Sequence, residues 1–312
     1  MADMTPPHHL PHLQWGAEAL WKRLDPLQPR ITVEVLARTD STNTRLLDRA
    51  RQASGQFRAM PTRPGGLDDL RSRGPRGRRL VDHQPGLLVA EHQTRGRGRH
   101  GRDWQGSAGA SLTFSLSLAL APADWSGLSL AVGLALAEAL DPPGAGSPAR
   151  LVLKWPNDLW LADADAPGGG RKLGGILIET VNVGEHRMCV IGIGLNVTPQ
   201  AHSGLSHGYA CLRELDPTTS APSALARVAE PLVRAVLAFE REGLGAAGQA
   251  AWARRDILFG RAITTTSADC DSGIADGVDE LGALRVRSAD GGAAVRVVSG
   301  EVSVRLNPPS AA

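Results

Sequence analysis

A segment rich in arginine and glycine, QTRGRGRHGRDW at residues 93–104, is the first feature of the sequence that suggests chemistry. Glycine lets main-chain N–H groups approach a ligand closely, and arginine forms charge-assisted, bidentate hydrogen bonds with carboxylates and phosphates. The segment therefore favours a binding site for an anion. An exposed, solvated hairpin loop and an RGG-type RNA-binding tail have similar compositions. The tail is disfavoured because such segments repeat, whereas this one occurs once between apolar runs.

The glycines of this segment also match the dinucleotide-binding pattern G-x-G-x-x-G, which requires a strand before it and a helix after it. Residues 86–93, GLLVAEHQ, are typical of a buried strand. Residues 111–120, SLTFSLSLAL, alternate apolar and hydroxyl side chains, which predicts a second strand with one buried face. The segment thus connects two strands, and the dinucleotide interpretation is rejected.

A second candidate, KWPND at residues 154–158, combines a cation, an aromatic ring, a proline, an amide and a carboxylate. Pro156 restricts the preceding tryptophan to extended geometry, so we expect a strand to end here and to project Asn157 and Asp158 into a cleft. Asp158 would hold Mg²⁺ or accept a proton there. An ordinary turn, in which both side chains bond the local backbone, is the alternative.

Lysine is scarce: Lys22, Lys154 and Lys172 are the only three lysines among 34 basic residues. Lysine is a compact point charge on a thin stem, whereas arginine is a broad planar fork. Lys172 lies next to paired glycines at the start of a predicted strand, where its stem would reach a phosphate in a crowded site. The surrounding sequence is not a P-loop, because Leu173 stands where a Ser or Thr is required.

The elements that must position these residues predict an α+β protein with a mixed sheet flanked by helices. Apolar runs predict strands around the candidate residues and helices at 126–140 and 223–242. From residue 257, short alternating runs separated by Gly and Asp predict a small β-barrel. The expected organisation is a partly disordered N-terminal segment, a catalytic domain with a basic loop insert, and the barrel, at residues 1–37, 38–256 (insert 54–84) and 257–312.

Composition limits the function classes. A net charge of +2, from 34 basic and 32 acidic residues, gives no argument for a polyanion partner. The sequence has no secretory signal and no apolar run of membrane-spanning length, so a cytoplasmic protein without membrane contact is expected. Cys189, Cys211 and Cys270 fit reduced thiols of the cytosol. A nucleic-acid-binding protein using residues 63–79 and 95–102 is a competing hypothesis, weakened because no aromatic residues alternate with the arginines of the first stretch.

Five segments occur in the order and approximate spacing found in bacterial biotin protein ligases, and the chain resembles that family from about residue 38 to its end. They are STN (41–43), GRGRHGRDW (96–104), KWPND (154–158), RKLGGILIE (171–179) and GIGLNV (192–197). The resemblance implies a class II synthetase-like, lipoyl/biotinyl ligase catalytic domain and a C-terminal SH3-like barrel. It is to the short form, because only about forty residues precede STN, without the helix-turn-helix DNA-binding domain of the family's repressors.

The resemblance also implies an activity. ATP and biotin would form biotinyl-5′-AMP with Mg²⁺ as cofactor, and biotin would pass to a lysine of the biotin carboxyl carrier protein of acetyl-CoA carboxylase. Lys172, Arg97 and Asp158 would be catalytic, with Asp158 also the candidate metal contact. The implied biotin contacts are Ser41, Thr42, Asn43, Gln93, Gly96, Arg97, Gly98, Arg99, Lys172 and Gly175. The implied ATP contacts are Arg97, Arg99, Arg102, Trp104, Asn157, Asp158 and Asn196.

Departures and alternatives accompany this interpretation. His100 stands where family members often have another arginine. A lipoate protein ligase would share the fold and the adenylate chemistry, but its typical Arg-Arg-x-x-Gly-Gly-Gly pattern is absent. Nucleic-acid binding is not expected, and the sequence leaves the oligomeric state open, with a homodimer as one possibility.

Overall fold

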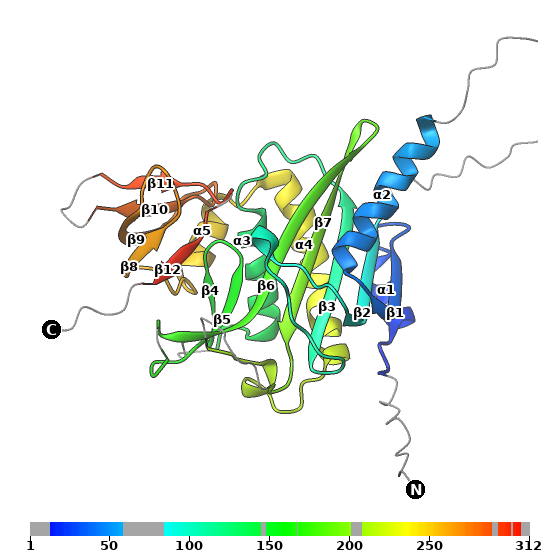
Figure 1. Cartoon of the computed structure of the whole chain (residues 1–312), viewed down its shortest axis with the longest axis horizontal. Helices are drawn as coiled ribbons and strands as arrows, with labels where there is room; N and C mark the ends of the chain where they lie inside the picture. The colour runs from blue at the N-terminus through cyan, green and yellow to red at the C-terminus, as the bar shows by residue number, and fades with distance from the viewer. Residues whose placement is uncertain are drawn as a thin grey trace, which may run out of the picture.

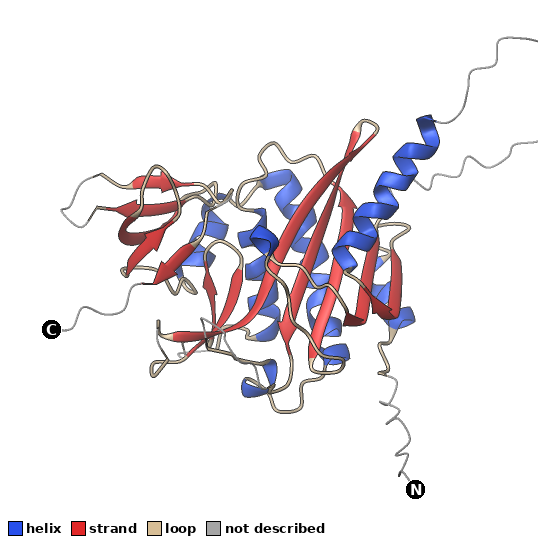
Figure 2. Ribbon diagram, in the orientation of Figure 1, coloured by secondary structure: helices blue, strands red, loops and turns tan. Residues whose placement is uncertain are grey.

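The computed structural model describes residues 13–58, 84–144, 148–166, 168–200, 208–288, 293–300 and 302–306. A large mixed sheet and a small antiparallel sheet organise these residues (Figure 1, Figure 2). The strands of the large sheet are β1 (Thr32–Thr39), β2 (Gly86–Gln93), β3 (Ser111–Ala119), β4 (Leu151–Lys154), β5 (Asp158–Ala162), β6 (Gly170–Val183) and β7 (His186–Asn196). The helices are α1 (Ala17–Leu24), α2 (Thr42–Arg58), α3 (Leu128–Leu140), α4 (Ala221–Glu242) and α5 (Gly245–Ala253).

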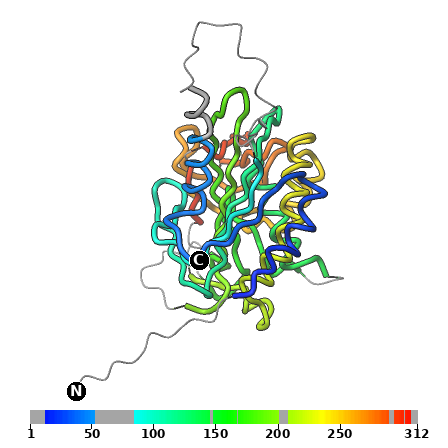
Figure 3. The backbone as a smooth tube through the Cα atoms, turned by 90° about the vertical axis from the view of Figure 1, so that its right-hand side faces the viewer, coloured from blue at the N-terminus to red at the C-terminus, as the bar shows by residue number. Residues whose placement is uncertain are grey.

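The large sheet has the strand order β1-β2-β3-β7-β6-β5-β4, and within it only β1 and β2 are parallel. Seen edge-on, the sheet separates α1 and α4 from α2 and the loop between β2 and β3 (Figure 3). The mixed sheet predicted from the sequence is confirmed. The arginine-glycine segment connects β2 to β3, strand to strand, as expected.

The expectation that β3 has one buried face was wrong, because both faces are covered. Its apolar residues, such as Phe114, pack into the main core with α3 and α4. Its hydroxyl residues, Ser111 to Ser117, are also buried, because α2 packs against that side of the sheet. The alternation therefore distinguishes two buried environments. The apolar side chains face the hydrophobic core, and the hydroxyl side chains face the polar side of the sheet that α2 covers.

The first domain boundary also needs correction. Residues before position 38 form α1 and most of β1, and Thr32–Thr39 pair with Gly86–Gln93 inside the large sheet. Leu20, Leu24 and Ile31 belong to the main core, so this segment is part of the sheet domain. Residues 54–58, assigned by the sequence to a loop insert, end α2. The rest of that insert at 59–83 lies outside the described residues, as do residues 1–12.

The C-terminal residues form a five-stranded antiparallel sheet, consistent with the predicted SH3-like barrel. Its order is β11-β10-β9-β8-β12. The strands are β8 (Ala262–Thr265), β9 (Ser272–Val278), β10 (Leu284–Arg287), β11 (Val295–Val297) and β12 (Val304–Leu306). Within the described part of the chain, no helix combines the length and apolar character that crossing a membrane requires.

Candidate functional site

A cavity of about 900 Å³ lies between the large sheet, the arginine-glycine loop and the β12 region of the C-terminal sheet. It collects side chains from segments that are far apart in the sequence. Fourteen of the fifteen site residues predicted above line it: Ser41, Thr42, Asn43, Gln93, Arg97, Gly98, Arg99, Arg102, Trp104, Asn157, Asp158, Lys172, Gly175 and Asn196. The other, Gly96, accepts a hydrogen bond from the Trp104 backbone N–H (2.9 Å) and closes the base of the loop.

One end of the cavity is neutral and polar. The first turn of α2 brings Ser41, Thr42 and Asn43 there, all nearly buried. The Thr42 backbone N–H donates to Oε1 of Gln93 (2.7 Å), so the start of the helix is tied to the end of β2. This end therefore presents fixed donors and acceptors rather than charge.

Ser115 of β3 supports this polar end and was missed by the sequence-based site. Its Oγ lies 2.6 Å from both Thr42 Oγ1 and Asn43 Oδ1. An amide oxygen can only accept, so the single Ser115 proton points to Asn43. The hydroxyl of Thr42 then donates to Ser115 or Gln93. The alternation of Ser and Thr along β3 was the available signal, because buried hydroxyls need partners.

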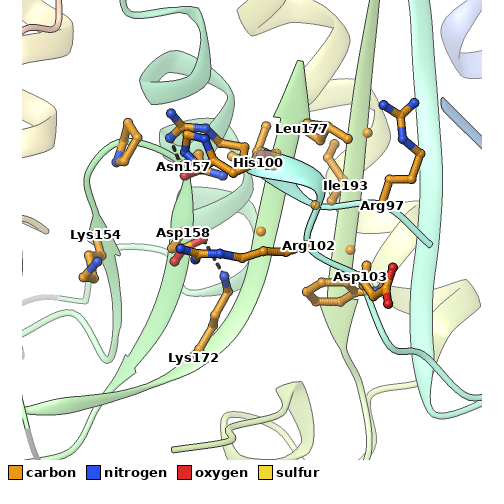
Figure 4. Close-up of a pocket in the computed structure, with 18 of the residues that line it drawn as sticks. Arg97, His100, Arg102, Asp103, Lys154, Asn157, Asp158, Lys172, Leu177 and Ile193 are labelled. Carbon is orange, nitrogen blue, oxygen red and sulfur yellow. Dashed lines mark hydrogen bonds and ion pairs between the residues drawn. The ribbon is translucent and has the colours of Figure 1, made fainter. Parts of the chain in front are cut away.

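The opposite end is charged. Lys172 Nζ donates to Asp158 Oδ1 at 2.7 Å, and the side chain of Arg102 points toward this pair from the loop (Figure 4). Asp158 is the first residue of β5 and pairs with Gly175 of β6. Gly175 lies beside the ion pair, because a Cβ there would be in van der Waals contact with both Asp158 Oδ1 (3.5 Å) and Lys172 Nζ (3.7 Å). The strand expected to end at KWPND does so, with a turn between Lys154 and Asp158.

Arg97 does not join the Lys172–Asp158 pair. Its guanidinium points away from them (Figure 4) and makes a bidentate ion pair with Glu179 of β6, at 2.9 and 3.2 Å. Glu179 also accepts a hydrogen bond from Asn43 Nδ2 (3.0 Å). The sequence offered no signal for Glu179 beyond its place at the end of the RKLGGILIE segment.

Arg99 bonds protein atoms on two sides of the cavity. One Nη donates to Asn157 Oδ1 (3.1 Å), and the other to the carbonyl oxygens of Ser299 (2.7 Å) and Gly300 (2.6 Å). Burial lowers the pKa of Arg99, although Asp158 opposes this effect. The predicted nucleotide contact thus also connects the loop to the C-terminal sheet.

Lys154 makes a second connection to that sheet. Its Nζ donates to the Val304 carbonyl oxygen (2.6 Å) and lies 5.6 Å from the centre of the Trp160 ring. Burial lowers the pKa of Lys154. Lys154 and Lys172 both line the cavity but have different partners: Lys172 pairs with Asp158, whereas Lys154 donates to the main chain of the C-terminal sheet.

The β6 end that carries Lys172 is held by Arg171. This side chain donates to Asp163 (2.6 Å) and to Glu214 (2.6 Å), with a further bond to the Tyr209 carbonyl oxygen (2.7 Å). Asn196 is similarly committed to the main chain, because its Nδ2 donates to the Ala210 carbonyl oxygen (3.0 Å). These contacts fix the wall beside Lys172.

The tip of the loop is a tight turn, in which the Gly98 N–H donates to the Arg102 carbonyl oxygen (2.7 Å). His100 has a left-handed φ of 57° there and lines the cavity. Trp104 follows the turn, and its indole N–H is buried with no hydrogen-bond partner in the described ranges.

Two glycines of GIGLNV let site side chains approach β7. A Cβ on Gly192 would collide with the Asn43 amide, and one on Gly194 would collide with the Trp104 ring. Both glycines therefore pack against residues of the site itself. The segment is a wall on which the polar end and the loop rest.

Gly192→Ala is therefore expected to weaken binding at the polar end about 10-fold or more, because overpacking by one methyl costs about 1–3 kcal/mol. Isothermal titration calorimetry with biotin, the ligand the sequence resemblance implies, checks this. Gly248→Ala in α5 is the matched control, since its Cβ would also collide with a side chain, that of Leu244 at 2.6 Å, and Leu244 does not line the cavity. Equal biotin affinities for the two variants would contradict the conclusion that Gly192 forms part of the binding site.

Carboxylates are few in the cavity. Asp103 and Asp158 are the acidic residues that line it among those described, and no cluster of three potential metal-ligating side chains occurs there. This donor set does not suit a cation held by protein alone. It does fit Mg²⁺, which usually binds one or two carboxylates together with substrate phosphates.

Comparisons with known proteins point in one direction. The model of the Biotin/lipoate A/B protein ligase family matches residues 79–196. The bifunctional ligase/repressor BirA of Escherichia coli is 35% identical over 223 residues, covering 70% of this chain and 65% of that protein. The biotin--[acetyl-CoA-carboxylase] ligase of Paracoccus denitrificans is 30% identical over 272 residues, 82% of this chain and 95% of that protein.

The fold comparison agrees with these matches. A solved structure of the biotin protein ligase from Aquifex aeolicus, in complex with biotin and ATP, superposes with a TM-score of 0.62. The match covers 88% of this chain and 99% of that chain at 22% identity. At this identity the likeness concerns the fold, and it includes most of the described elements.

Proposed function

The chain belongs to the biotin protein ligase family, and from this premise we propose that it activates biotin with ATP and transfers biotin to a protein lysine. The observation that carries the proposal is that a neutral polar end and a cationic end share one cavity. Biotin needs both, because its ureido ring carries donors and an acceptor while its far end is a carboxylate. The lipoate alternative is less favoured, since the dithiolane ring of lipoate needs no such polar end.

In the first step, an oxygen of the biotin carboxylate attacks the α-phosphorus of ATP. The bond from the α-phosphorus to the bridging oxygen breaks, and pyrophosphate leaves with that oxygen. Both reactants are anions, so cationic groups must reduce their repulsion and stabilise charge in the transition state. Lys172, whose ammonium lies at the charged end, is assigned to the carboxylate and the α-phosphoryl oxygens, and Arg102 to the nucleotide.

The remaining site residues bind and orient. Ser41, Thr42, Asn43 and Gln93 are assigned to the ureido ring, and Trp104 covers the intermediate. Asn157 and Asn196 belong to the nucleotide side. When bound, Mg²⁺ would neutralise phosphate charge, with Asp158 as the residue that would hold it together with the phosphates.

In the second step, the ε-amine of the acceptor lysine attacks the biotinyl carbonyl carbon, an amide forms and AMP leaves. A neutral amine is the nucleophile, so the proton that it loses on bond formation needs an acceptor. We assign Asp158 to this role. The acceptor protein is the biotin carboxyl carrier protein of acetyl-CoA carboxylase, as the name of the Paracoccus relative supports.

Biotin-dependent exchange of pyrophosphate into ATP tests the first step most directly. We expect exchange with biotin and background exchange with lipoate. Incorporation of biotin into the purified carrier protein tests the second step. Background exchange with both acids would contradict the proposal, and salt-sensitive nucleic-acid affinity without turnover would favour the competing binding protein.

The loop at residues 95–104 is expected to close further over its ligands. Cationic side chains line the cavity, so an anion bound among them lowers their mutual repulsion. Biotin plus ATP should therefore slow tryptic cleavage within this loop several-fold. Mass spectrometry identifies the cleaved bonds, and biotin alone is the comparison. Identical cleavage rates with and without both ligands would contradict closure.

A further inference from the structure

Glu179 is a group that the mechanism above does not use, yet it contacts Asn43, which is assigned to the ureido ring, and Arg97 of the arginine-glycine loop. It lies on β6, outside the lining of the cavity. Asn43 reaches it from α2 and Arg97 from the loop, so three segments that are distant in the sequence meet at this carboxylate. Its side chain is 23% exposed, which limits but does not abolish screening by solvent.

The geometry uses both carboxylate oxygens. Oε1 accepts from Arg97 Nη2 (2.9 Å), while Oε2 accepts from Arg97 Nη1 (3.2 Å) and from Asn43 Nδ2 (3.0 Å). A bidentate pair of this kind fixes orientation as well as distance. The guanidinium and the amide are therefore held relative to each other through one shared group.

The same contact fixes the amide of Asn43. Its Nδ2 donates to Glu179 and to the Leu177 carbonyl oxygen (3.2 Å), while its Oδ1 accepts from Ser115. Both ends of the amide are thus assigned, and Gly192 leaves no room for it to move toward β7. If Glu179 were absent, the amide would lose one of its two acceptors.

We propose that Glu179 is a positioning residue for biotin, which couples the ureido-binding end of the cavity to the arginine-glycine loop. It acts through Asn43 and Arg97 and does not touch the substrate. This inference rests on the proposed function, because biotin is the ligand whose binding it concerns. It adds to that function a physical link between recognition of the ureido ring and the position of the arginine-glycine loop.

Glu179→Gln is the sharpest variant, because it keeps the shape and replaces one acceptor oxygen with a donor NH₂ group. That group would face either Arg97 or Asn43, both of which donate. We expect the biotin Kd, measured by isothermal titration calorimetry without ATP, to rise about 10-fold, and the KM for ATP in pyrophosphate exchange to change less than about twofold.

A second measurement does not depend on biotin. In the ligand-free protein, Glu179→Gln should accelerate tryptic cleavage at the loop arginines several-fold, because Arg97 loses its anionic partner. Glu185→Gln is the matched control: this glutamate is exposed in the turn after β6. Thermal unfolding of each variant identifies a general loss of structure, which would lower Tm and raise both Kd and KM.

A double-mutant cycle with Asn43→Ala tests the route of the effect. If Glu179 acts through Asn43, the loss in biotin affinity from Glu179→Gln should be smaller in the Asn43→Ala background. Parental biotin Kd and parental loop cleavage in Glu179→Gln would overturn the inference. A parent protein that fails to bind biotin would instead overturn the proposed function, and the cleavage comparison would still decide whether Glu179 anchors the loop.

Discussion

Lys172→Arg is expected to lower the rate of biotin-dependent pyrophosphate exchange about 100-fold, although it keeps the positive charge. The ammonium of Lys172 reaches Asp158 along β6, and its Nζ would lie 3.7 Å from a Cβ placed on Gly175. A planar guanidinium on a different stem does not fit this space with the same hydrogen bonds. Lys172→Ala, which also removes the charge, is expected to lose about 1000-fold.

The control for this prediction is Lys22→Arg. Lys22 is exposed on α1 and pairs with Glu18 at 2.6 Å, so it tests the effect of the same substitution away from the cavity. Exchange kinetics at saturating biotin and ATP separate the loss of rate from the loss of binding. Near-normal exchange by Lys172→Arg would mean that charge alone suffices and that the geometry argued here is unimportant.

Asp256→Asn is expected to change the pH dependence of stability more than any exposed Asp→Asn substitution. Asp256 lies in the segment between α5 and the C-terminal sheet, and burial raises the pKa of its carboxyl to about 6. The Leu258 N–H donates to Oδ1 (2.8 Å), while Oδ2 has no hydrogen-bond partner among the described residues. The ionised form therefore loses hydration that the protein replaces only in part.

The sign of the effect follows from that pKa. The native state holds the proton more tightly than the unfolded state, so this group stabilises at low pH and the contribution is lost as pH rises through about 6. The full shift corresponds to about 3 kcal/mol, of which about 2 kcal/mol falls between about pH 4.5 and about pH 7.5. The free energy of unfolding of Asp256→Asn minus that of the parent should therefore increase by about 2 kcal/mol from about pH 4.5 to about pH 7.5, because only the parent loses this contribution.

Urea unfolding at both pH values measures this difference, and it cancels the opposite contributions of carboxylates such as Glu34 and Glu230, whose pKa values are lowered by arginine hydrogen bonds. Asp269→Asn, at an exposed position of the C-terminal sheet domain, is the control. A relative stability of Asp256→Asn that does not vary with pH would show that Asp256 is hydrated in solution.

Much of the site could be predicted because its residues occur in short segments with chemical meaning. KWPND ends a strand because proline cannot continue it, and the arginine-glycine segment connects two strands because alternation identifies the second. The cavity also contains the predicted STN residues at the start of α2. In each case local backbone preferences agree with the position in the fold.

Other parts of the site depend on strand order and register, which one sequence does not specify. Ser115 and Glu179 act because β3, β7 and β6 are neighbours and because α2 lies across them. The polar residues in these two segments would equally fit a strand whose polar face is exposed to solvent. The same limit applies to Arg97, whose charge was predicted to serve the anion but whose partner is a carboxylate on a distant strand.

The boundary at residue 38 was wrong for a related reason. A parallel pairing between β1 and β2 joins segments separated by a helix and a long connection, and no local pattern reveals it. The first strand is also not strongly apolar, because it lies at the edge of the sheet. Its membership of the domain is decided by pairing rather than by composition.

The contacts of Arg99 and Lys154 with the C-terminal sheet end on peptide oxygens, those of Ser299, Gly300 and Val304. A main-chain acceptor is present whatever side chain a residue carries. These bonds therefore constrain the path of the backbone but not the amino-acid types at these positions. Homologous chains can consequently diverge in this stretch while keeping the two halves joined. An insertion or deletion that alters the local spacing is the change that such a junction would not tolerate.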